Sequence, residues 1–153
     1  MSTIATRHAR PGDLDAIATL FDAYRQFYEQ PPDRALARDY LAERFQRKES
    51  VVIVAEDDDG ALIGFTQLYP TFCSVRAAHT FVLYDLFVTR SARGTGAGRA
   101  LMLAAEAHAR QAGAARMELS TARTNKIGQS LYESVGWTRD DSFLVYGKDL
   151  RGQ

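Results

Sequence analysis

The stretch Arg93-Gly94-Thr95-Gly96-Ala97-Gly98-Arg99 decides the fold of this chain. It follows an apolar run over residues 81–88 and precedes an amphipathic pattern that predicts a helix over 98–111. That order indicates a strand, a glycine-rich turn and the first turn of a helix. Free backbone N–H groups and a partial positive charge at a helix start attract anions. The stretch therefore predicts a site for a phosphate or pyrophosphate group.

Glycine and arginine contribute different parts of this predicted site. The alternating glycines Gly94, Gly96 and Gly98 let the backbone approach a ligand without obstruction by a Cβ atom. Arg93 and Arg99 add guanidinium donors that suit phosphate oxygens. The alternative is a glycine-rich turn that only caps a helix.

Two familiar phosphate motifs do not fit this loop. A P-loop requires Gly-Lys-Ser/Thr at its end, and no Lys follows Gly98. A dinucleotide fingerprint, G-x-G-x-x-G, would need glycine at a position held by Arg99 or by Leu101. The pattern that fits is Arg-x-x-Gly-x-Gly, from Arg93 to Gly98.

A second helical pattern begins at Asn125 in the C-terminal third of the chain. Gly136 predicts its end, and Trp137 begins the next segment. The residues that recur at helical spacing are Ile127, Leu131, Tyr132 and Val135.

Together, the loop and the second helix resemble the GNAT superfamily of acetyl-coenzyme A-dependent N-acetyltransferases. The loop has the form of the family's pyrophosphate loop, and Asn125, Tyr132 and the Gly136-Trp137 pair match a helix that packs beside the cofactor. The resemblance covers essentially the whole chain, and its specific motifs lie within residues 83–137. It implies an α/β fold with a mixed, mostly antiparallel central sheet flanked by helices on both faces. We expect one N-acetyltransferase domain over residues 1–153.

Within the superfamily, the sequence resembles the Hpa-type branch of histone, polyamine and D-amino-acid acetyltransferases and their bacterial relatives. Residues 24–29, 64–70 and 85–88 carry that resemblance. Gly128 is a departure, since many relatives have Ala there. A helical Gly costs about 1 kcal/mol relative to Ala, so we expect a slightly looser second helix.

The resemblance implies a role for each part of the cofactor site. Strand residues would bind the pantetheine arm through their backbone, and the loop would cradle the pyrophosphate. Tyr132 would donate a proton to the departing coenzyme A sulfur; core packing is the alternative role for such a tyrosine. The implied acetyl-coenzyme A contacts are Leu86, Phe87, Val88, Arg93, Gly94, Thr95, Gly96, Ala97, Gly98, Arg99, Asn125 and Tyr132.

Asp85 is the candidate general base, acting through water. It interrupts the apolar strand just before the loop, where a charge must find a partner or change its pKa. The alternative is a structural Asp satisfied by backbone N–H groups or by an arginine. With Asp85, Tyr28 and Glu29 are the candidate acceptor contacts, because aromatic faces and carboxylates suit a cationic amine. A core role for Tyr28 and a solvated surface role for Glu29 remain open.

Composition limits the partners of the chain. Lys and Arg together number 19, as do Asp and Glu, so no global field would attract nucleic acid or an anionic membrane. Neither a signal peptide nor a transmembrane run is recognisable. The single Cys73 fits a reducing compartment, so we expect a cytoplasmic protein. We expect no metal, because the three histidines His8, His79 and His108 lack metal-ligand spacing.

Periodicity and turn residues predict the remaining elements. Asp33 would cap a helix with an apolar face formed by Leu36, Tyr40, Leu41 and Phe45. An Asp-Gly turn at residues 57–60 predicts a hairpin. Strands are expected over 4–8, 50–55, 61–69, 80–88 and 117–120, with closing strands near Trp137 and over 143–146. The first helix is expected to start near Pro11, and its apolar positions are Leu14, Ile17, Leu20, Phe21 and Tyr24.

The leading functional expectation is transfer of acetyl from acetyl-coenzyme A to a primary amine by direct attack in a ternary complex. A small molecule is the favoured acceptor, and a protein lysine is the other. One alternative is a coenzyme A-binding sensor without turnover. Another is a nucleotide-binding module, which the missing P-loop Lys and dinucleotide glycine disfavour. Relatives in the family commonly dimerise, so we expect a homodimer.

Overall fold

A computed structural model describes residues 3–152 of the chain. The chain forms two compact units, Met1–Ser120 and Thr121–Gln153. The elements in chain order are β1 (Ala5–His8), η1 (Pro11–Asp13), α1 (Leu14–Phe27), α2 (Arg34–Gln46), β2 (Val51–Glu56), β3 (Leu62–Cys73), β4 (Ala78–Val88), η2 (Arg90–Ala92), α3 (Ala97–Gln111), β5 (Arg116–Glu118) and α4 (Lys126–Ser134).

The first unit is built on one five-stranded sheet, with strand order β1-β2-β3-β4-β5. Every neighbouring pair is antiparallel except β4 and β5, which are parallel. The predicted mixed, mostly antiparallel sheet is therefore confirmed. Strand β3 continues beyond the predicted end at Tyr69 and includes Pro70. Proline is tolerated there because the ladder with β2 ends at Leu68, so β3 has a neighbour on one side only.

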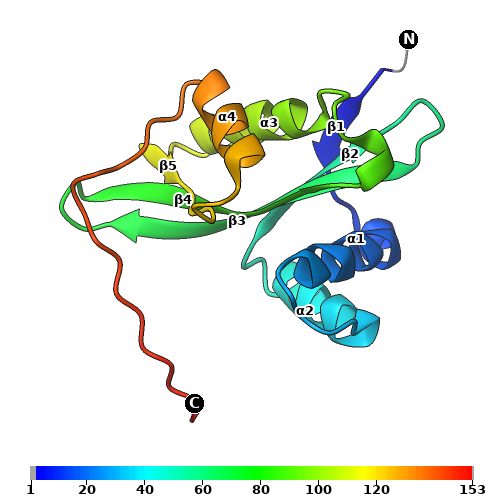
Figure 1. Cartoon of the computed structure of the whole chain (residues 1–153), viewed down its shortest axis with the longest axis horizontal. Helices are drawn as coiled ribbons and strands as arrows, with labels where there is room; N and C mark the ends of the chain where they lie inside the picture. Colours follow the sequence, from blue (N-terminus) through cyan, green and yellow to red (C-terminus); the bar gives the residue numbers. More distant parts are fainter. Residues whose placement is uncertain (1–2, 153) are drawn as a thin grey trace. The chain divides into compact units, whose positions relative to one another are not determined.

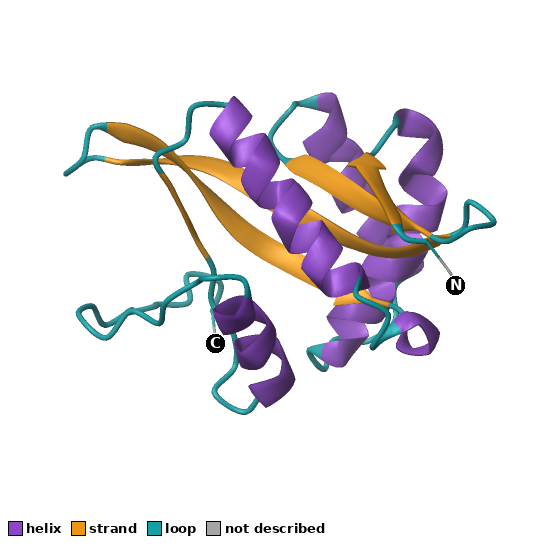
Figure 2. Cartoon of the chain, turned by 90° about the horizontal axis from the view of Figure 1, so that it is seen from above, coloured by secondary structure: helices purple, strands orange, loops and turns teal. Residues whose placement is uncertain are grey.

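Helices cover both faces of this sheet. Figure 1 shows α1 and α2 on one side and α3 on the other, and Figure 2 shows α3 lying across the strands. Consecutive residues of β3 point to opposite faces. Phe65 packs edge-on against Phe21 of α1, whereas a Cβ atom on Gly64 would lie 3.2 Å from the Leu101 side chain of α3.

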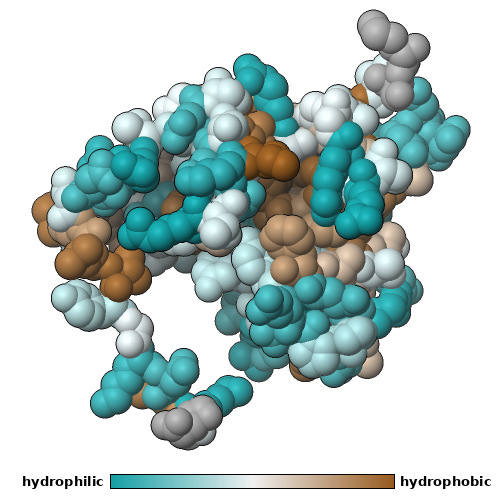
Figure 3. All heavy atoms as spheres, in the orientation of Figure 1, coloured by the Kyte–Doolittle hydropathy of each residue, from teal (hydrophilic) through white to brown (hydrophobic). Residues whose placement is uncertain are grey.

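A hydrophobic core fills the space between α1, α2 and the sheet. The largest fully buried side chains in this layer include Ile17, Leu41 and Phe65. The predicted apolar face of α2 is correct for Leu41, but Leu36 is 51% exposed and Ala37 is buried instead. Ala37 and Leu41 lie one turn apart, so they define the buried stripe, and Leu36 falls beside it. Figure 3 shows hydrophilic side chains over the outer surface of α1 and α2.

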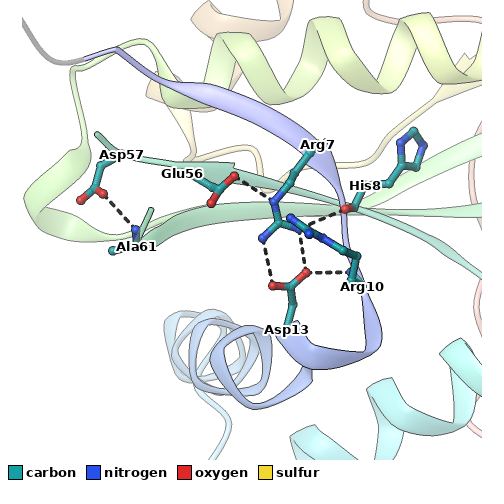
Figure 4. Close-up of polar contacts among 7 residues, drawn as sticks. All are labelled: Arg7, His8, Arg10, Asp13, Glu56, Asp57 and Ala61. Atoms are coloured by element: carbon teal, nitrogen blue, oxygen red, sulfur yellow. Dashed lines mark hydrogen bonds and ion pairs between the residues drawn. The ribbon is translucent and has the colours of Figure 1, made fainter. Parts of the chain in front are cut away.

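An ion-pair network ties the start of the chain to the sheet (Figure 4). Arg7 of β1 donates from two guanidinium nitrogens to the Asp13 carboxylate, at 2.8 and 3.0 Å, and from Nε to Glu56 at 2.8 Å. The Arg7 hydrogen bonds lower the pKa of Asp13 to about 2. In the same view, the Asp57 carboxylate accepts the Ala61 amide at 3.0 Å and closes the predicted hairpin turn.

Replacing Asp13 with Asn should lower the free energy of unfolding at neutral pH. The folded-state pKa lies below the unfolded value near 3.8, so the stabilisation is present above that pH and is lost as pH falls toward 2. We expect a loss of about 1–2 kcal/mol at pH 7 in urea unfolding. Asp15→Asn is the matched control, because the Asp15–Arg38 pair lies on the surface, where such pairs contribute little. Equal losses in both variants would contradict the prediction.

His8 and His108 connect β1 to α3 through their rings. The His8 Nε2 and His108 Nδ1 atoms lie 2.9 Å apart, and the His108 ring packs against Phe81 at 5.6 Å between centroids. Burial, with a smaller contribution from His8, lowers the pKa of His108. Within residues 3–152, no three His, Cys, Asp or Glu side chains gather as a metal site would require.

The second unit contains one helix, α4, followed by an extended segment. Gly136 has a φ of 94° and ends the helix as predicted. The predicted closing strands near Trp137 and over 143–146 are wrong, because no described residue after α4 belongs to a strand. A strand requires a neighbour for its backbone hydrogen bonds, and residues 137–150 have no ladder partner within the described chain. The side chains Phe143, Leu144, Val145 and Tyr146 are 79–94% exposed.

Candidate active site

Strand β4 has an unpaired edge along its C-terminal half. Its ladder with β5 ends where Val82 faces Glu118, yet β4 continues to Val88. The edge opens because β5 is only three residues long. An extended backbone with free N–H and C=O groups can pair with an extended ligand. The predicted pantetheine contacts Leu86, Phe87 and Val88 all lie in this stretch.

The glycine-rich loop leads from this edge directly into α3. Gly94 and Gly96 have φ values of 80° and 92°, a conformation that glycine adopts without a Cβ penalty. Gly96 is the N-cap of α3. The amides of Ala97, Gly98 and Arg99 have no backbone acceptor within the described chain. The predicted strand, glycine turn and helix start are thus confirmed, with unpaired donors at the helix start.

Two loop side chains are held by the protein's own carbonyl groups. Arg93 donates from Nε to the Val88 carbonyl at 3.1 Å, and its guanidinium lies 5.7 Å from the centre of the Phe87 ring. The Thr95 hydroxyl donates to the Ala92 carbonyl. Both hydrogen bonds stabilise the conformation of the turn. Arg93 therefore has a structural role in the loop in addition to any role toward an anion.

Asp85 is almost completely buried, with 3% of its surface exposed. It faces Gln67 across the β3–β4 ladder, and Gln67 Nε2 donates to Asp85 Oδ2 at 2.7 Å. Burial raises the pKa of Asp85, while the Gln67 hydrogen bond and the nearby Tyr24 hydroxyl oppose the rise. No arginine pairs with this carboxyl group in the described chain. A carboxylate without a cationic partner and with a raised pKa is a better proton acceptor than an ordinary surface carboxylate.

A β-bulge places Tyr84 and Asp85, two neighbouring residues of β4, on the α1/α2 side of the sheet. The register passes from Gln67 opposite Asp85 to Leu68 opposite Leu83, which leaves Tyr84 unpaired. The Tyr84 ring contacts the Tyr69 ring at 5.5 Å between centroids. Bulges occur next to active sites, where they redirect a side chain.

The predicted acceptor contacts Tyr28 and Glu29 lie at the C-terminal end of α1. Tyr28 is the C-cap residue, is 44% exposed, and packs edge-on against Tyr24 at 5.2 Å. Glu29 has a φ of 65° and is exposed. The Tyr24 hydroxyl donates to the Tyr84 carbonyl at 3.2 Å. Tyr24 therefore links Tyr28 to the bulge beside Asp85.

Asn125 and Tyr132 belong to the second unit. Asn125 lies at the predicted start of the helix and caps α4. Its side-chain oxygen accepts the Gly128 amide at 3.1 Å, and its Nδ2 donates to the Thr121 hydroxyl at 3.0 Å. Tyr132 is half-buried on α4. The roles of both residues toward a cofactor stay predictions.

Replacing Gly128 with Ala should fail to deliver the gain in stability that helix propensity suggests. A Cβ atom at this position would lie 2.5 Å from Asn125 Nδ2, so the cap must move. We expect the propensity gain of about 1 kcal/mol to be offset by a similar loss of capping. The Tm should therefore change little in Gly128→Ala. Adding Asn125→Ala to this variant should lower the Tm no further, because the cap is already lost. A clear rise in Tm for Gly128→Ala alone would contradict this account.

Sequence reasoning missed several residues around Asp85, chiefly Gln67, Tyr24, Tyr69 and Tyr84. Gln67 interrupts an apolar strand just as Asp85 does, and that repeated pattern could have paired them. The bulge at Tyr84 has no comparable signal in the sequence.

Comparisons with known proteins identify the class. Residues 15–137 match the Acetyltransferase (GNAT) family. YhfO of Bacillus subtilis, described as an uncharacterized N-acetyltransferase, is 45% identical over 140 residues, which cover 92% of this chain and 93% of YhfO. The chain belongs to the GNAT acetyltransferase family.

Two further comparisons extend this result. A crystal structure described as that of a probable acetyltransferase is 35% identical, with a TM-score of 0.89 over 99% of both chains. A mycothiol acetyltransferase of Pseudarthrobacter chlorophenolicus is 31% identical over 131 residues, which cover 82% of this chain and 40% of that protein. In residues 3–152, no helix is long and apolar enough to cross a membrane.

Proposed function

We propose that this protein is an acetyl-coenzyme A-dependent N-acetyltransferase that acetylates a primary amine of a small molecule. The observation that carries the proposal is the continuous path from the unpaired edge of β4 to the free amides at the start of α3. A buried, raised-pKa carboxyl group, Asp85, lies on the same strand just before that path. The reaction would take place in one domain over residues 1–153.

The cofactor would bind along the edge of β4 and at the glycine-rich loop. Backbone atoms of Leu86, Phe87 and Val88 would pair with the amides of the pantetheine arm. Residues 93–99 would hold the pyrophosphate through backbone N–H groups, assisted by Arg93 and Arg99. Asn125 would contribute from the second unit.

The chemistry requires a neutral amine. At pH 7 only about one alkylamine in several thousand is unprotonated, a deficit of roughly 4.6 kcal/mol. Asp85 would accept the amine proton through water, and the amine nitrogen would then attack the thioester carbon. The carbon–sulfur bond breaks as the amide forms, and Tyr132 would donate a proton to the departing sulfur. The second proton that the attacking nitrogen releases would restore the Tyr132 hydroxyl.

Balanced charge supports a small acceptor over a basic protein tail, because the chain has equal numbers of acidic and basic residues. A protein lysine is the second acceptor class. We also propose a cytoplasmic location and a homodimer, and light scattering of the purified chain tests the latter.

Release of free thiol from acetyl-coenzyme A across a panel of amines tests the function. The panel includes alkylamines, polyamines, D- and L-amino acids, aminoglycosides and a lysine-rich peptide. We expect release with one amine class, and about 10-fold slower release in Tyr132→Phe, because the leaving thiolate loses its proton donor. Tyr146→Phe is the matched control on the exposed segment of the same unit. Tight coenzyme A binding with no release on any amine would favour a sensor.

A further inference from the structure

Gln67 holds a buried acceptor atom that no group in the described chain satisfies. The residue is fully buried, and its Nε2 donates to Asp85, but its Oε1 has no hydrogen-bond partner. Buried side-chain oxygens are nearly always paired, because an unpaired one loses its hydration without compensation. The unpaired amide oxygen and the Asp85 carboxyl group thus belong to one hydrogen-bonded pair of side chains, and both can accept from a donor with several N–H bonds.

Five of the chain's seven tyrosines form a connected group that reaches Asp85 through Tyr24. We refer to Tyr24, Tyr28, Tyr40, Tyr69 and Tyr84 as the tyrosine cluster. Ring contacts at 5.2 and 5.5 Å join two pairs within it. A 2.6 Å contact between the Tyr40 and Tyr69 hydroxyls joins α2 to β3. Three of the rings are 36–65% exposed, whereas Gln67 and Asp85 lie buried beneath.

Charge around the tyrosine cluster is nearly balanced outside Asp85. Arg44 lies 4.7 Å from the centre of the Tyr40 ring and pairs with Glu43 and Glu49. Arg47 also pairs with Glu43. Burial raises the pKa of Tyr24 and of Tyr69, so both hydroxyls remain neutral. A second ammonium group that reached the Tyr40 end of the cluster would be repelled by the Arg44 guanidinium.

On the basis of the proposed function, we propose that the acceptor is a primary amine with a single positive charge on an aromatic or alicyclic body. Its ammonium group donates to Gln67 Oε1 and, through a water molecule, to Asp85, entering past the exposed Tyr84 ring. Its apolar body packs against the tyrosine cluster. Ring faces attract an ammonium group, and ring edges and faces pack against an apolar body, so one surface serves both parts of the ligand.

Thiol release from acetyl-coenzyme A with matched amines tests this inference. We expect kcat/KM for 2-phenylethylamine and cyclohexylmethylamine to exceed that for n-propylamine and putrescine by at least about 10-fold. Tyr84→Ala should lower kcat/KM for 2-phenylethylamine about 10-fold, mainly through KM, and should lower kcat/KM for n-propylamine much less, because n-propylamine has no ring to lose contact with Tyr84. Gln67→Glu, which adds a second carboxylate, should shift the preference toward putrescine.

Tyr146→Ala is the control variant, because Tyr146 is 88% exposed on the second unit and should leave every rate unchanged. Preference for putrescine in the wild type, or an equal loss on all amines in Tyr84→Ala, would overturn the inference while leaving the N-acetyltransferase proposal intact. Failure of every amine to release thiol would instead contradict the proposed function on which the inference rests.

Discussion

Replacing Asp85 with Asn should lower kcat/KM for the acceptor amine by about 100-fold, the lower end of what a general base contributes. Asn retains the shape of the side chain and can still pair with Gln67, but it cannot accept the amine proton. The measurement is thiol release from acetyl-coenzyme A at saturating cofactor, with the amine varied. Binding of acetyl-coenzyme A by calorimetry should change little, because Asp85 lies on the α1/α2 side of the sheet, where we propose that the acceptor binds.

The pH profile separates a base from a structural residue. In the wild type, kcat/KM should rise as Asp85 loses its proton, and burial moves that ionisation upward from its usual acidic range. Asp85→Asn should lose this inflection and retain only the rise that comes from deprotonation of the amine. If the variant keeps the full wild-type profile at a reduced level, Asp85 is not the base.

Stability provides a second, independent readout. Because the folded-state pKa of Asp85 lies above the unfolded value, the buried carboxylate destabilises the fold as pH rises through that interval and beyond. A neutral Asn avoids this cost, so the variant should unfold at the same or a higher temperature at pH 7–8. Lower activity with equal or greater stability is the trade-off expected of a functional charge. A variant that loses both would indicate a structural role.

The sequence was sufficient to predict the elements that depend on local chemistry. Asp33 and Asn125 both cap helices through their side chains, since a short polar side chain at that position satisfies a free amide. Gly94 and Gly96 adopt the left-handed conformation at the predicted turn. The apolar face of α1 is buried at Ile17, as helical spacing indicated.

Features set by pairing between distant segments could not be predicted in the same way. The bulge at Tyr84 depends on the register of β4 against β3, and alternation in one strand does not encode that register. The pairing of Gln67 with Asp85 follows from the same register. Residues 143–146 have a strand-like composition, yet composition alone supplies no neighbouring strand to pair with.

Replacing Gly96 with Val should raise the Kd for acetyl-coenzyme A by about 30-fold. Residue 96 has a left-handed backbone conformation, which strains a β-branched residue. Nothing lies within 4 Å of a Cβ atom at this position, so the strain would arise from the backbone and not from a collision. The loop should relax and move the amides of Ala97, Gly98 and Arg99 out of line with the pyrophosphate, each charged hydrogen bond being worth about 1.5–3 kcal/mol. Calorimetry with acetyl-coenzyme A measures the change.

Acetyl-pantetheine makes the experiment specific, because it carries the thioester and the pantetheine arm but no pyrophosphate. Gly96→Val should spare kcat/KM for acetyl-pantetheine while lowering that for acetyl-coenzyme A. Gly12→Val is the matched control, since Gly12 also has open space but no positive φ, and it should affect neither donor. An equal loss with both donors would mean that Gly96 shapes the fold and not the pyrophosphate contact. A loss confined to acetyl-coenzyme A would assign the loop to the anion, and the unpaired edge of β4 would then account for the binding that remains.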